Sequence, residues 1–87
     1  MALDVAPSPT RPKLLLSDDE LAAIPWVQAD IADTNAVNAV FKAHKIDSVV
    51  HLGALQVPFC KADPVAGARV NVVGTANIME AVRANDI

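Results

Sequence analysis

Three short apolar segments alternate with helix-forming segments along this chain, and this alternation restricts the folds that it can adopt. The apolar segments are MALDV at 1–5, PWVQADI at 25–31 and IDSVVHL at 46–52. A helix between two strands carries the chain back across the sheet, so strands that alternate with helices become parallel neighbours. The pattern predicts an α/β fold with about three strands and about three helices.

The first two predicted helices are marked by residues that cap helix N-termini. Ser17 and Glu20 have the spacing of a capping box, in which each side chain bonds the backbone N–H of the other residue. Three prolines from Pro7 to Pro12 come before this helix and predict a loop, because proline has no backbone N–H. Asp33 or Thr34 can cap the second helix.

The third predicted helix is the longest. It opens with Asp63 as a cap and Pro64 as its first helical residue, and it extends to Asn85. Four of its residues lie at steps of three and four and share one face: Gly67, Asn71, Gly74 and Ile78. A glycine inside a helix costs about 1 kcal/mol relative to alanine, so we expect this face to pack closely against another backbone.

Composition and charge limit the classes of partner. With 87 residues the chain has room for one domain, 1–87, and its net charge of −3 argues against nucleic acid or an anionic membrane surface as the main partner. No apolar run is long enough to cross a membrane, and no secretory signal is visible. Cys60 is the only cysteine, which excludes an internal disulfide and agrees with a cytoplasmic location.

The ends of the predicted strands are the candidate site. In open parallel sheets, ligands bind beyond the carboxyl ends of the strands. The three predicted strand ends are Asp4, Asp30 and the segment His51–Gln56. Gly53 and Ala54 are small, which indicates that another group comes close to the backbone just beyond the third strand.

Four segments carry a family resemblance. LDV, ADIAD, DSVVHLGALQ and DPVAGARVNVVGTANIMEAVR, in this order and spacing, resemble the NAD-dependent epimerase/dehydratase family, the extended short-chain dehydrogenase/reductases. The resemblance implies that residues 1–87 form part of an NAD(P)-binding Rossmann-type domain with a doubly wound parallel sheet. It also implies that the chain begins at the family's second strand and stops after its fourth helix.

The resemblance gives roles to the two acidic strand ends. Asp4 would accept hydrogen bonds from the adenosine ribose and repel a 2′-phosphate, which favours NAD over NADP, although the nearby Arg11 leaves an opening for NADP. Asp30 and Ile31 would flank the adenine, with the carboxylate accepting from its exocyclic amine. The structural alternatives are that Asp4 only ends a strand and that Asp30 caps the next helix together with Asp33.

The loop after the third strand would lie under the ribose and pyrophosphate. Its residues are Leu52, Gly53, Ala54, Leu55 and Gln56. A bulky side chain at Gly53 would displace the cofactor, and Gln56 could bond a phosphate or ribose, where many relatives carry Lys or Ser. The resemblance places Asn71 near the floor of the active site, where it steadies this loop. The alternative is an ordinary polar residue of the helix.

No catalytic residue and no metal site are assigned in this chain. His51 ends an apolar strand and is expected to be a packed, hydrogen-bonded side chain, and His44 carries no catalytic signal either. Cys60 has no nearby basic partner in the sequence that would lower the pKa of its thiol, so an unreactive thiol is expected. No spacing of His, Cys and carboxylate residues matches a known ligand set.

Two parts of the family's machinery are absent from the sequence. The glycine-rich turn Gly-x-x-Gly-x-x-Gly does not occur, and the chain has no Tyr, so it lacks the Tyr-x-x-x-Lys pair that transfers a proton during hydride chemistry. We therefore expect a fragment of an NAD-dependent epimerase/dehydratase-like oxidoreductase that carries the adenosine side of the dinucleotide site and is inactive alone. The nucleotide-sugar or similar hydroxyl substrate would bind elsewhere in the complete protein.

The rival interpretation is a non-enzymatic nucleotide-binding or oligomerisation module with the same scaffold. The corresponding helix of the family commonly packs into a four-helix dimer interface. The outer side of the last predicted helix is rich in Ala and Val. The outer side of this last helix is therefore a candidate surface for a homodimer.

The isolated chain is predicted to be marginally stable. In a doubly wound sheet the first strand lies between the second and the fourth, so its loss leaves a central gap with two unpaired edges. A thermal melt of the 87-residue chain with and without NAD is expected to show no cooperative, NAD-shifted transition. A clear upward shift of the midpoint with NAD would show this expectation to be wrong.

Overall fold

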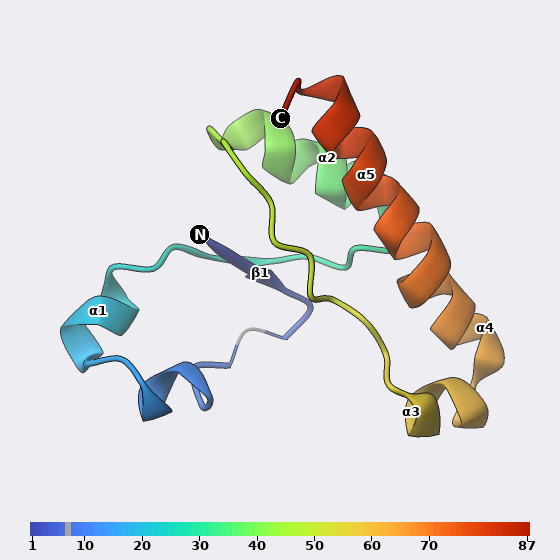
Figure 1. Ribbon diagram of the computed structural model, residues 1–87, viewed down its shortest axis with the longest axis horizontal. Coiled ribbons are helices and arrows are strands. Elements are labelled where there is room, and N and C mark those ends of the chain that lie inside the picture. Colours follow the sequence, from blue (N-terminus) through green and yellow to red (C-terminus); the bar gives the residue numbers. More distant parts are fainter. Residues whose placement is uncertain (7) are drawn as a thin grey trace.

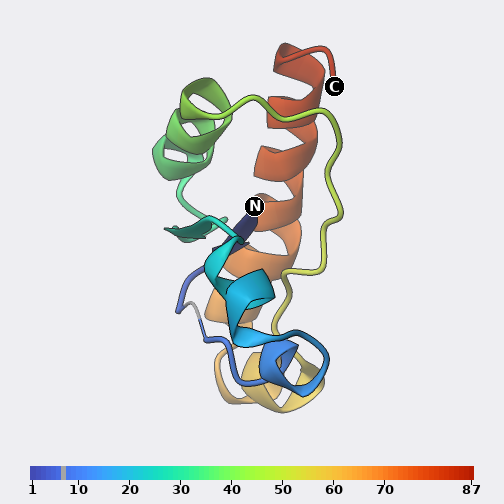
Figure 2. The same cartoon turned by 90° about the vertical axis from the view of Figure 1, so that its left-hand side faces the viewer.

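The structure is a computed structural model that describes residues 1–6 and 8–87. Pro7, one of the prolines of the predicted loop, lies outside the described residues. Figure 1 shows the arrangement of the elements, and Figure 2 shows it from the side. In chain order they are β1 (Ala2–Asp4), η1 (Pro12–Leu14), α1 (Asp18–Ala22), β2 (Trp26–Gln28), α2 (Thr34–Ala43), α3 (Val57–Ala62), α4 (Pro64–Ala68), η2 (Arg69–Gly74) and α5 (Thr75–Ala84).

β1 and β2 form a two-stranded parallel sheet. Ala2 pairs with Trp26, and Asp4 pairs with Gln28. The connection between the two strands contains η1 and α1, which supply the length that a parallel crossover needs. The α/β fold class with a parallel sheet is therefore confirmed, although β2 ends at Gln28, two residues before Asp30.

The third predicted strand is wrong as a strand. Residues 46–52 carry no strand assignment, and the described part of the chain contains a sheet of two strands only. The apolar sequence of this segment is suited to a strand, but a ladder also needs a neighbouring backbone at hydrogen-bonding distance. No backbone hydrogen bond to or from residues 46–52 is formed within the described chain. The segment therefore runs unpaired beside the sheet.

Capping residues fix the starts of the helices, as predicted. The backbone N–H of Ser17 donates to Glu20 Oε2 (2.8 Å), and that of Glu20 donates to Ser17 Oγ (3.2 Å), which completes the capping box of α1. Of the two candidate caps for α2, Asp33 is the one used, since its Oδ1 accepts from Ala36 N–H (3.0 Å).

The predicted long helix is present but is not a uniform α-helix. α4, η2 and α5 follow one another as a single rod along one side of the molecule (Figure 1), and η2 is a π-helical stretch in its middle. α3 is a helix that the sequence analysis does not predict. Its signal is Pro58 in the first helical turn, where proline is tolerated. No helix in the described chain is long and apolar enough to cross a membrane.

The core lies where α2 packs against α5. Val37 and Phe41 of α2 and Ile78 and Ala81 of α5 form its buried cluster. Figures 1 and 2 both show these two helices side by side at the end of the molecule that holds the C-terminus. Four partly buried side chains surround the cluster: Ile31, Ile46, Val82 and Ile87. Through Ile31 and Ile46, the loop after β2 and the start of segment 46–52 both pack against the helix pair α2 and α5.

The two glycines of the rod allow close approach, as predicted, but to different groups. A Cβ at Gly67 would lie 2.8 Å from Cys60 Sγ and 3.2 Å from its Cα, so a backbone does approach here. A Cβ at Gly74 would lie 2.7 Å from Ile31 Cγ1 and 2.8 Å from its Cδ1, so here the neighbour is a side chain. Gly74 therefore makes room for the residue that follows Asp30.

We predict that Gly74→Ala destabilises α5. Alanine favours helix by about 1 kcal/mol over glycine, but overpacking a fitted contact costs about 1–3 kcal/mol. The net loss of stability is about 1 kcal/mol, which should raise the rate of amide hydrogen exchange in α5 about fivefold. In an Ile31→Ala background the contact is gone, and Gly74→Ala should slow the same amides. Slower exchange in α5 when Ile31 is present would contradict the packing described here.

Candidate functional site

A cavity of about 430 Å³ lies beyond the carboxyl ends of both strands, next to the loop that follows residues 46–52. This volume is within the range of small-molecule sites. Seven of the nine residues predicted to bind a cofactor line it: Asp4, Asp30, Ile31, Leu52, Gly53, Ala54 and Leu55. These residues come from three separate parts of the chain, and the tertiary structure brings them to one place. Gln56 and Asn71 are not among the lining residues.

Each acidic strand end stabilises its own turn through one carboxylate oxygen. Asp4 Oδ1 accepts from Ala6 N–H (3.0 Å), and Asp30 Oδ1 accepts from Ala32 N–H (2.8 Å). The second carboxylate oxygen of each has no hydrogen bond to the described chain. Because Asp33 caps α2, Asp30 does not have that structural task, and the capping alternative for it is wrong.

Contacts within the protein explain why residue 53 is a glycine. A Cβ there would lie 3.2 Å from Ile31 Cδ1, which is tighter than an ordinary contact, and 3.5 Å from His51 Cε1, which is an ordinary contact. Gly53 thus lets the loop after segment 46–52 lie against the turn after β2. Gly53 also lines the cavity, and room for a cofactor beside it stays a prediction.

Asn71 holds this loop through the peptide groups of Leu55. The Leu55 N–H donates to Asn71 Oδ1 (2.7 Å), and Asn71 Nδ2 donates to the Leu55 carbonyl oxygen (3.0 Å). Asn71 Nδ2 also lies 3.5 Å from Cys60 Sγ, which itself donates to the Leu55 carbonyl oxygen (3.4 Å). The side-chain amide of Asn71 therefore binds the loop by hydrogen bonds, which is the steadying role that the family resemblance implied.

Two further polar residues of the rod hold segment 46–52 and the turn after β2, and the sequence analysis does not identify them. Thr75 Oγ1 lies 3.0 Å from His51 Nε2, which makes His51 the packed, hydrogen-bonded side chain that was predicted. Asn77 Nδ2 donates to the Ile31 carbonyl oxygen (2.8 Å), and Asn77 Oδ1 accepts from Thr34 Oγ1 (3.0 Å). The signal available in the sequence was two uncharged polar residues within the mainly apolar stretch 70–79 of the rod.

Gln56 lies at the edge of the site. It is the exposed residue before α3, and its side chain makes no capping hydrogen bond. Its side chain therefore has no structural task in the described chain. Contact with a phosphate or ribose stays a prediction for this residue.

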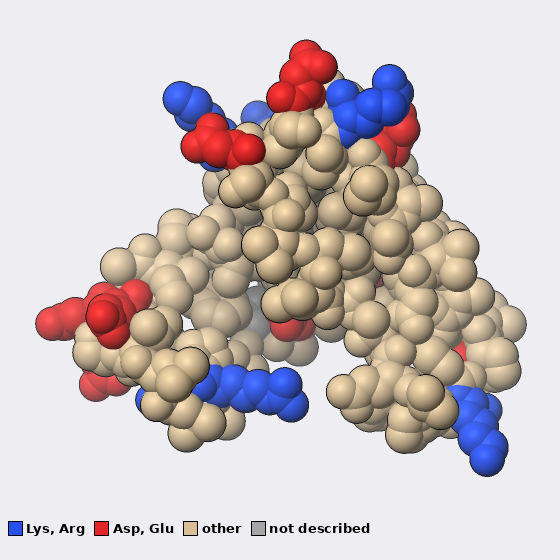
Figure 3. Space-filling model, viewed as in Figure 1, with Lys and Arg blue, Asp and Glu red and all other residues tan. Residues whose placement is uncertain are grey.

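Negatively charged side chains, Asp4 and Asp30, line the site near the ends of the two strands. Figure 3 shows the molecule hollowed between the lobe of η1 and α1 and the lobe of α3, with acidic atoms at the upper edge of the hollow. A basic side chain extends toward the hollow from the η1 lobe (Figure 3), and the η1 segment carries Arg11 and Lys13. Within residues 1–6 and 8–87 no group of three His, Cys, Asp or Glu residues could hold a metal ion.

Comparisons with known proteins agree with this geometry. The family described as GDP-mannose 4,6 dehydratase matches residues 9–87. Over 59 residues the chain is 41% identical to the uronate dehydrogenase of Agrobacterium fabrum (strain C58 / ATCC 33970), which covers 68% of this chain and 20% of that protein. The X-ray structure of Pen from Bacillus thuringiensis has a TM-score of 0.72 at 26% identity. That match covers 98% of this chain and 26% of the chain of Pen, so this chain spans a fifth to a quarter of both relatives.

We predict that Asn71→Ala releases the Leu55 loop. The Leu55 N–H loses its partner and the Leu55 carbonyl oxygen keeps Cys60 Sγ alone, and an unsatisfied buried group costs about 1–3 kcal/mol. Exchange of the Leu55 amide should therefore rise about tenfold or more. Asn38→Ala, at an exposed position of α2, is the matched control and should leave this amide unchanged. Equal exchange of the Leu55 amide in both variants would show that Asn71 does not hold the loop.

Proposed function

We propose that this chain, which belongs to the GDP-mannose 4,6-dehydratase family of NAD-dependent epimerases and dehydratases, carries the adenosine side of a nicotinamide-dinucleotide site. One observation carries the proposal: the cavity gathers both acidic strand ends and the glycine loop around one space. The comparisons support the family, which uses a nicotinamide dinucleotide. Residues 1–87 would then be part of an NAD(P)-binding Rossmann-type domain.

The residues around the cavity suit an adenosine group. Asp4 and Asp30 only accept hydrogen bonds when ionised, while ribose hydroxyls and the adenine amine donate them. Apolar side chains of Leu3, Ile31 and Leu52 line the same cavity and offer a surface for the flat base. Leu55 and its neighbours would support the sugar, because Asn71 fixes the Leu55 peptide groups.

NAD is proposed over NADP because of Asp4. This exposed carboxylate ends β1 at the cavity, and a second negative charge from a 2′-phosphate would be repelled there. Arg11, which precedes η1, is the group that could offset this repulsion. The preference for NAD over NADP therefore depends on whether the side chain of Asp4 or that of Arg11 contacts the ribose.

The complete reaction is proposed from the family. The dinucleotide supplies hydride transfer, and a nucleotide-sugar or related hydroxyl compound would be the substrate. The present residues would bind and orient the adenosine end, while the proton-transferring pair Tyr-x-x-x-Lys does not occur among them. We therefore propose that these residues alone have no oxidoreductase activity. A cytoplasmic location is likewise a prediction, motivated by the single cysteine.

An oligomerisation role is the second candidate, and the outer side of the rod favours it. Val65, Val72 and Met79 follow one another at seven-residue steps and are 69%, 67% and 62% exposed. Residues at this spacing lie along one stripe of a helix, which suits packing against another helix. On the same helix, hydrogen bonds from Arg83 lower the pKa of the Glu80 carboxyl. A homodimer through α4–α5 is proposed on this basis.

A titration of the ¹⁵N-labelled chain with NAD tests the site. We expect weak binding, with a dissociation constant of about 1 mM, and chemical-shift changes confined to the amides near Asp4, Asp30 and Gly53. Asp4→Asn should weaken NAD binding about tenfold, since a hydrogen bond to a charged group is lost, and should reduce discrimination against NADP. Asp47→Asn, an exposed carboxylate outside the cavity, is the matched control. Shift changes scattered over the chain, or equal effects of both variants, would reject the proposed site.

This weak binding is compatible with a melt that NAD does not shift. At a ligand concentration equal to the dissociation constant, binding stabilises the folded state by about 0.4 kcal/mol. That is too little to turn a marginal chain into a cooperative one. The two measurements therefore test different statements, one about the location of the site and one about the stability of the sheet.

A further inference from the structure

Asn77 of α5 holds the turn that follows β2, although it lies outside the candidate dinucleotide cavity. Its Nδ2 donates to the Ile31 carbonyl oxygen (2.8 Å), and its Oδ1 accepts from Thr34 Oγ1 (3.0 Å). Asn77 is half-buried and is not among the residues that line the cavity. Asp30 and Ile31, by contrast, do line it. The contact of Asn77 with the site therefore runs through this turn.

A single peptide group joins Asn77 to the carboxylate of Asp30. The carbonyl of Ile31 and the N–H of Ala32 belong to one planar trans unit, so they point in opposite directions. The carbonyl oxygen accepts from Asn77 on one side, and the N–H donates to Asp30 Oδ1 (2.8 Å) on the other. Asn77 thus orients this peptide group, and the peptide group holds one oxygen of Asp30. The other oxygen of Asp30 has no hydrogen bond within the described chain.

The two partners of Asn77 also fix the orientation of its amide. A carbonyl oxygen only accepts, so the NH₂ group faces Ile31, and the amide oxygen faces Thr34, whose hydroxyl donates. Thr34 is the first residue of α2. The amide therefore ties the turn to α2 as well as to α5. An aspartate at position 77 would keep an acceptor for Thr34 but would place an oxygen against the Ile31 carbonyl.

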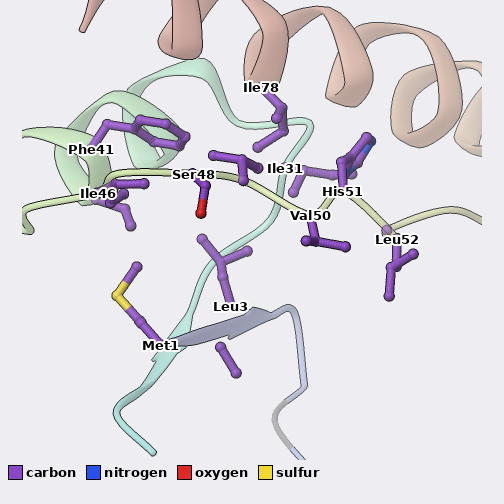
Figure 4. A pocket seen from close by; sticks show the side chains of 14 residues that line it. Met1, Leu3, Ile31, Phe41, Ile46, Ser48, Val50, His51, Leu52 and Ile78 are labelled. Atoms are coloured by element: carbon purple, nitrogen blue, oxygen red, sulfur yellow. The ribbon is translucent and has the colours of Figure 1, made fainter. Parts of the chain in front are cut away.

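The side chain of Ile31 is held by the same rod. Figure 4, which shows the side chains around the gap between β1 and residues 46–52, places Ile31 below Ile78 of α5. Ile31 packs against the buried cluster to which Ile78 belongs. Gly74 leaves room for it, since a Cβ there would lie 2.7 Å from Ile31 Cγ1. With its side chain packed and its carbonyl bonded, Ile31 keeps the neighbouring carboxylate of Asp30 in one place beside the cavity.

A carboxylate oxygen that is held in one place can distinguish purine bases. Adenine carries an amine, which donates, at the position where hypoxanthine carries a carbonyl, which only accepts. A carboxylate that faces this position binds the amine and repels the carbonyl. Hypoxanthine has an N–H on the neighbouring ring atom, so a carboxylate that is free to turn can bind either base. Discrimination between the two bases therefore depends on how firmly Asp30 is held.

We propose that Asn77 is a positioning residue that makes the site specific for an adenine dinucleotide over its hypoxanthine analogue. Asn77 acts on Asp30 through the peptide group of Ile31 and Ala32 and does not touch the ligand. This inference rests on the proposed function, because it requires a dinucleotide in the cavity. The alternative is that Asn77 only joins α5 to α2 and supports the fold. A purely structural role would weaken the binding of both dinucleotides equally.

Titrations of the ¹⁵N-labelled chain with NAD and with nicotinamide hypoxanthine dinucleotide test the proposal. The parent chain should bind NAD about tenfold more tightly than the analogue. Asn77→Ala and Asn77→Asp both lose the donor to Ile31, so this ratio should fall to about twofold or less. Alanine favours helix, so Asn77→Ala should keep the circular dichroism of the parent.

Three further variants show which contact matters. Thr34→Val removes only the hydroxyl that binds the amide oxygen, and it should keep the tenfold ratio because the donor to Ile31 remains. Asn38→Ala and Asn38→Asp, at an exposed position of α2, are the matched controls and should keep the ratio as well. A ratio that falls as far in Thr34→Val as in Asn77→Ala would contradict the proposed route through Ile31.

Amide exchange of Ala32 adds a measurement that needs no ligand. Its N–H belongs to the peptide group that Asn77 binds, so exchange should rise about tenfold in Asn77→Ala and stay unchanged in Asn38→Ala. An unchanged Ala32 amide in Asn77→Ala, or an equal loss of affinity for both dinucleotides, would overturn the role of Asn77 and leave the proposed function intact. Absence of NAD-induced shifts at the cavity of the parent chain would instead reject the proposed function, and this inference with it.

Discussion

The contact between the long helical rod and the turns after the strands determines most of this structure. Gly74 lets Ile31 approach the rod, while Asn77 accepts from Thr34 and donates to the Ile31 carbonyl oxygen. Asn71 and Thr75 hold the neighbouring loop in the same way, through Leu55 and His51. The candidate cavity exists because one helix positions both of these turns, which are distant in sequence. The sheet itself, with two short strands, is too small to do this.

The second constraint is the incomplete sheet. Helices α2 and α5 have their core, but the strand layer beside them contains a gap between β1 and residues 46–52. A strand is stable only when its backbone pairs, and the polar backbone groups along the gap have no partner in the described chain. The structure thus combines a helix pair with well-defined packing and a site whose two sides are joined mainly through side chains of the rod. We expect low stability and weak ligand binding because of the same gap.

Several features could be read from the sequence because they depend on neighbouring residues. The capping box at Ser17, the Asp33 cap and the start of the rod at Asp63 are local hydrogen-bond patterns, and all three are present. The acidic residues after β1 and β2 and the small residues at 53 and 54 meet at one cavity, as the topology of a parallel sheet implies. The cofactor that this cavity binds stays a prediction.

The sequence by itself determined where α1, α2 and the rod begin and which residues lie at the ends of β1 and β2, because each of these depends on short-range chemistry, whereas α3 was not predicted. Tertiary structure decided the rest. Residues 46–52 have the composition of a strand but no partner at hydrogen-bonding distance, and Asn71 contacts a loop peptide through a pairing that spans 16 residues of sequence. Strand pairing and hydrogen bonds from side chains to distant loops join segments that are far apart in the sequence. Only the folded arrangement of the chain could therefore show which of them form.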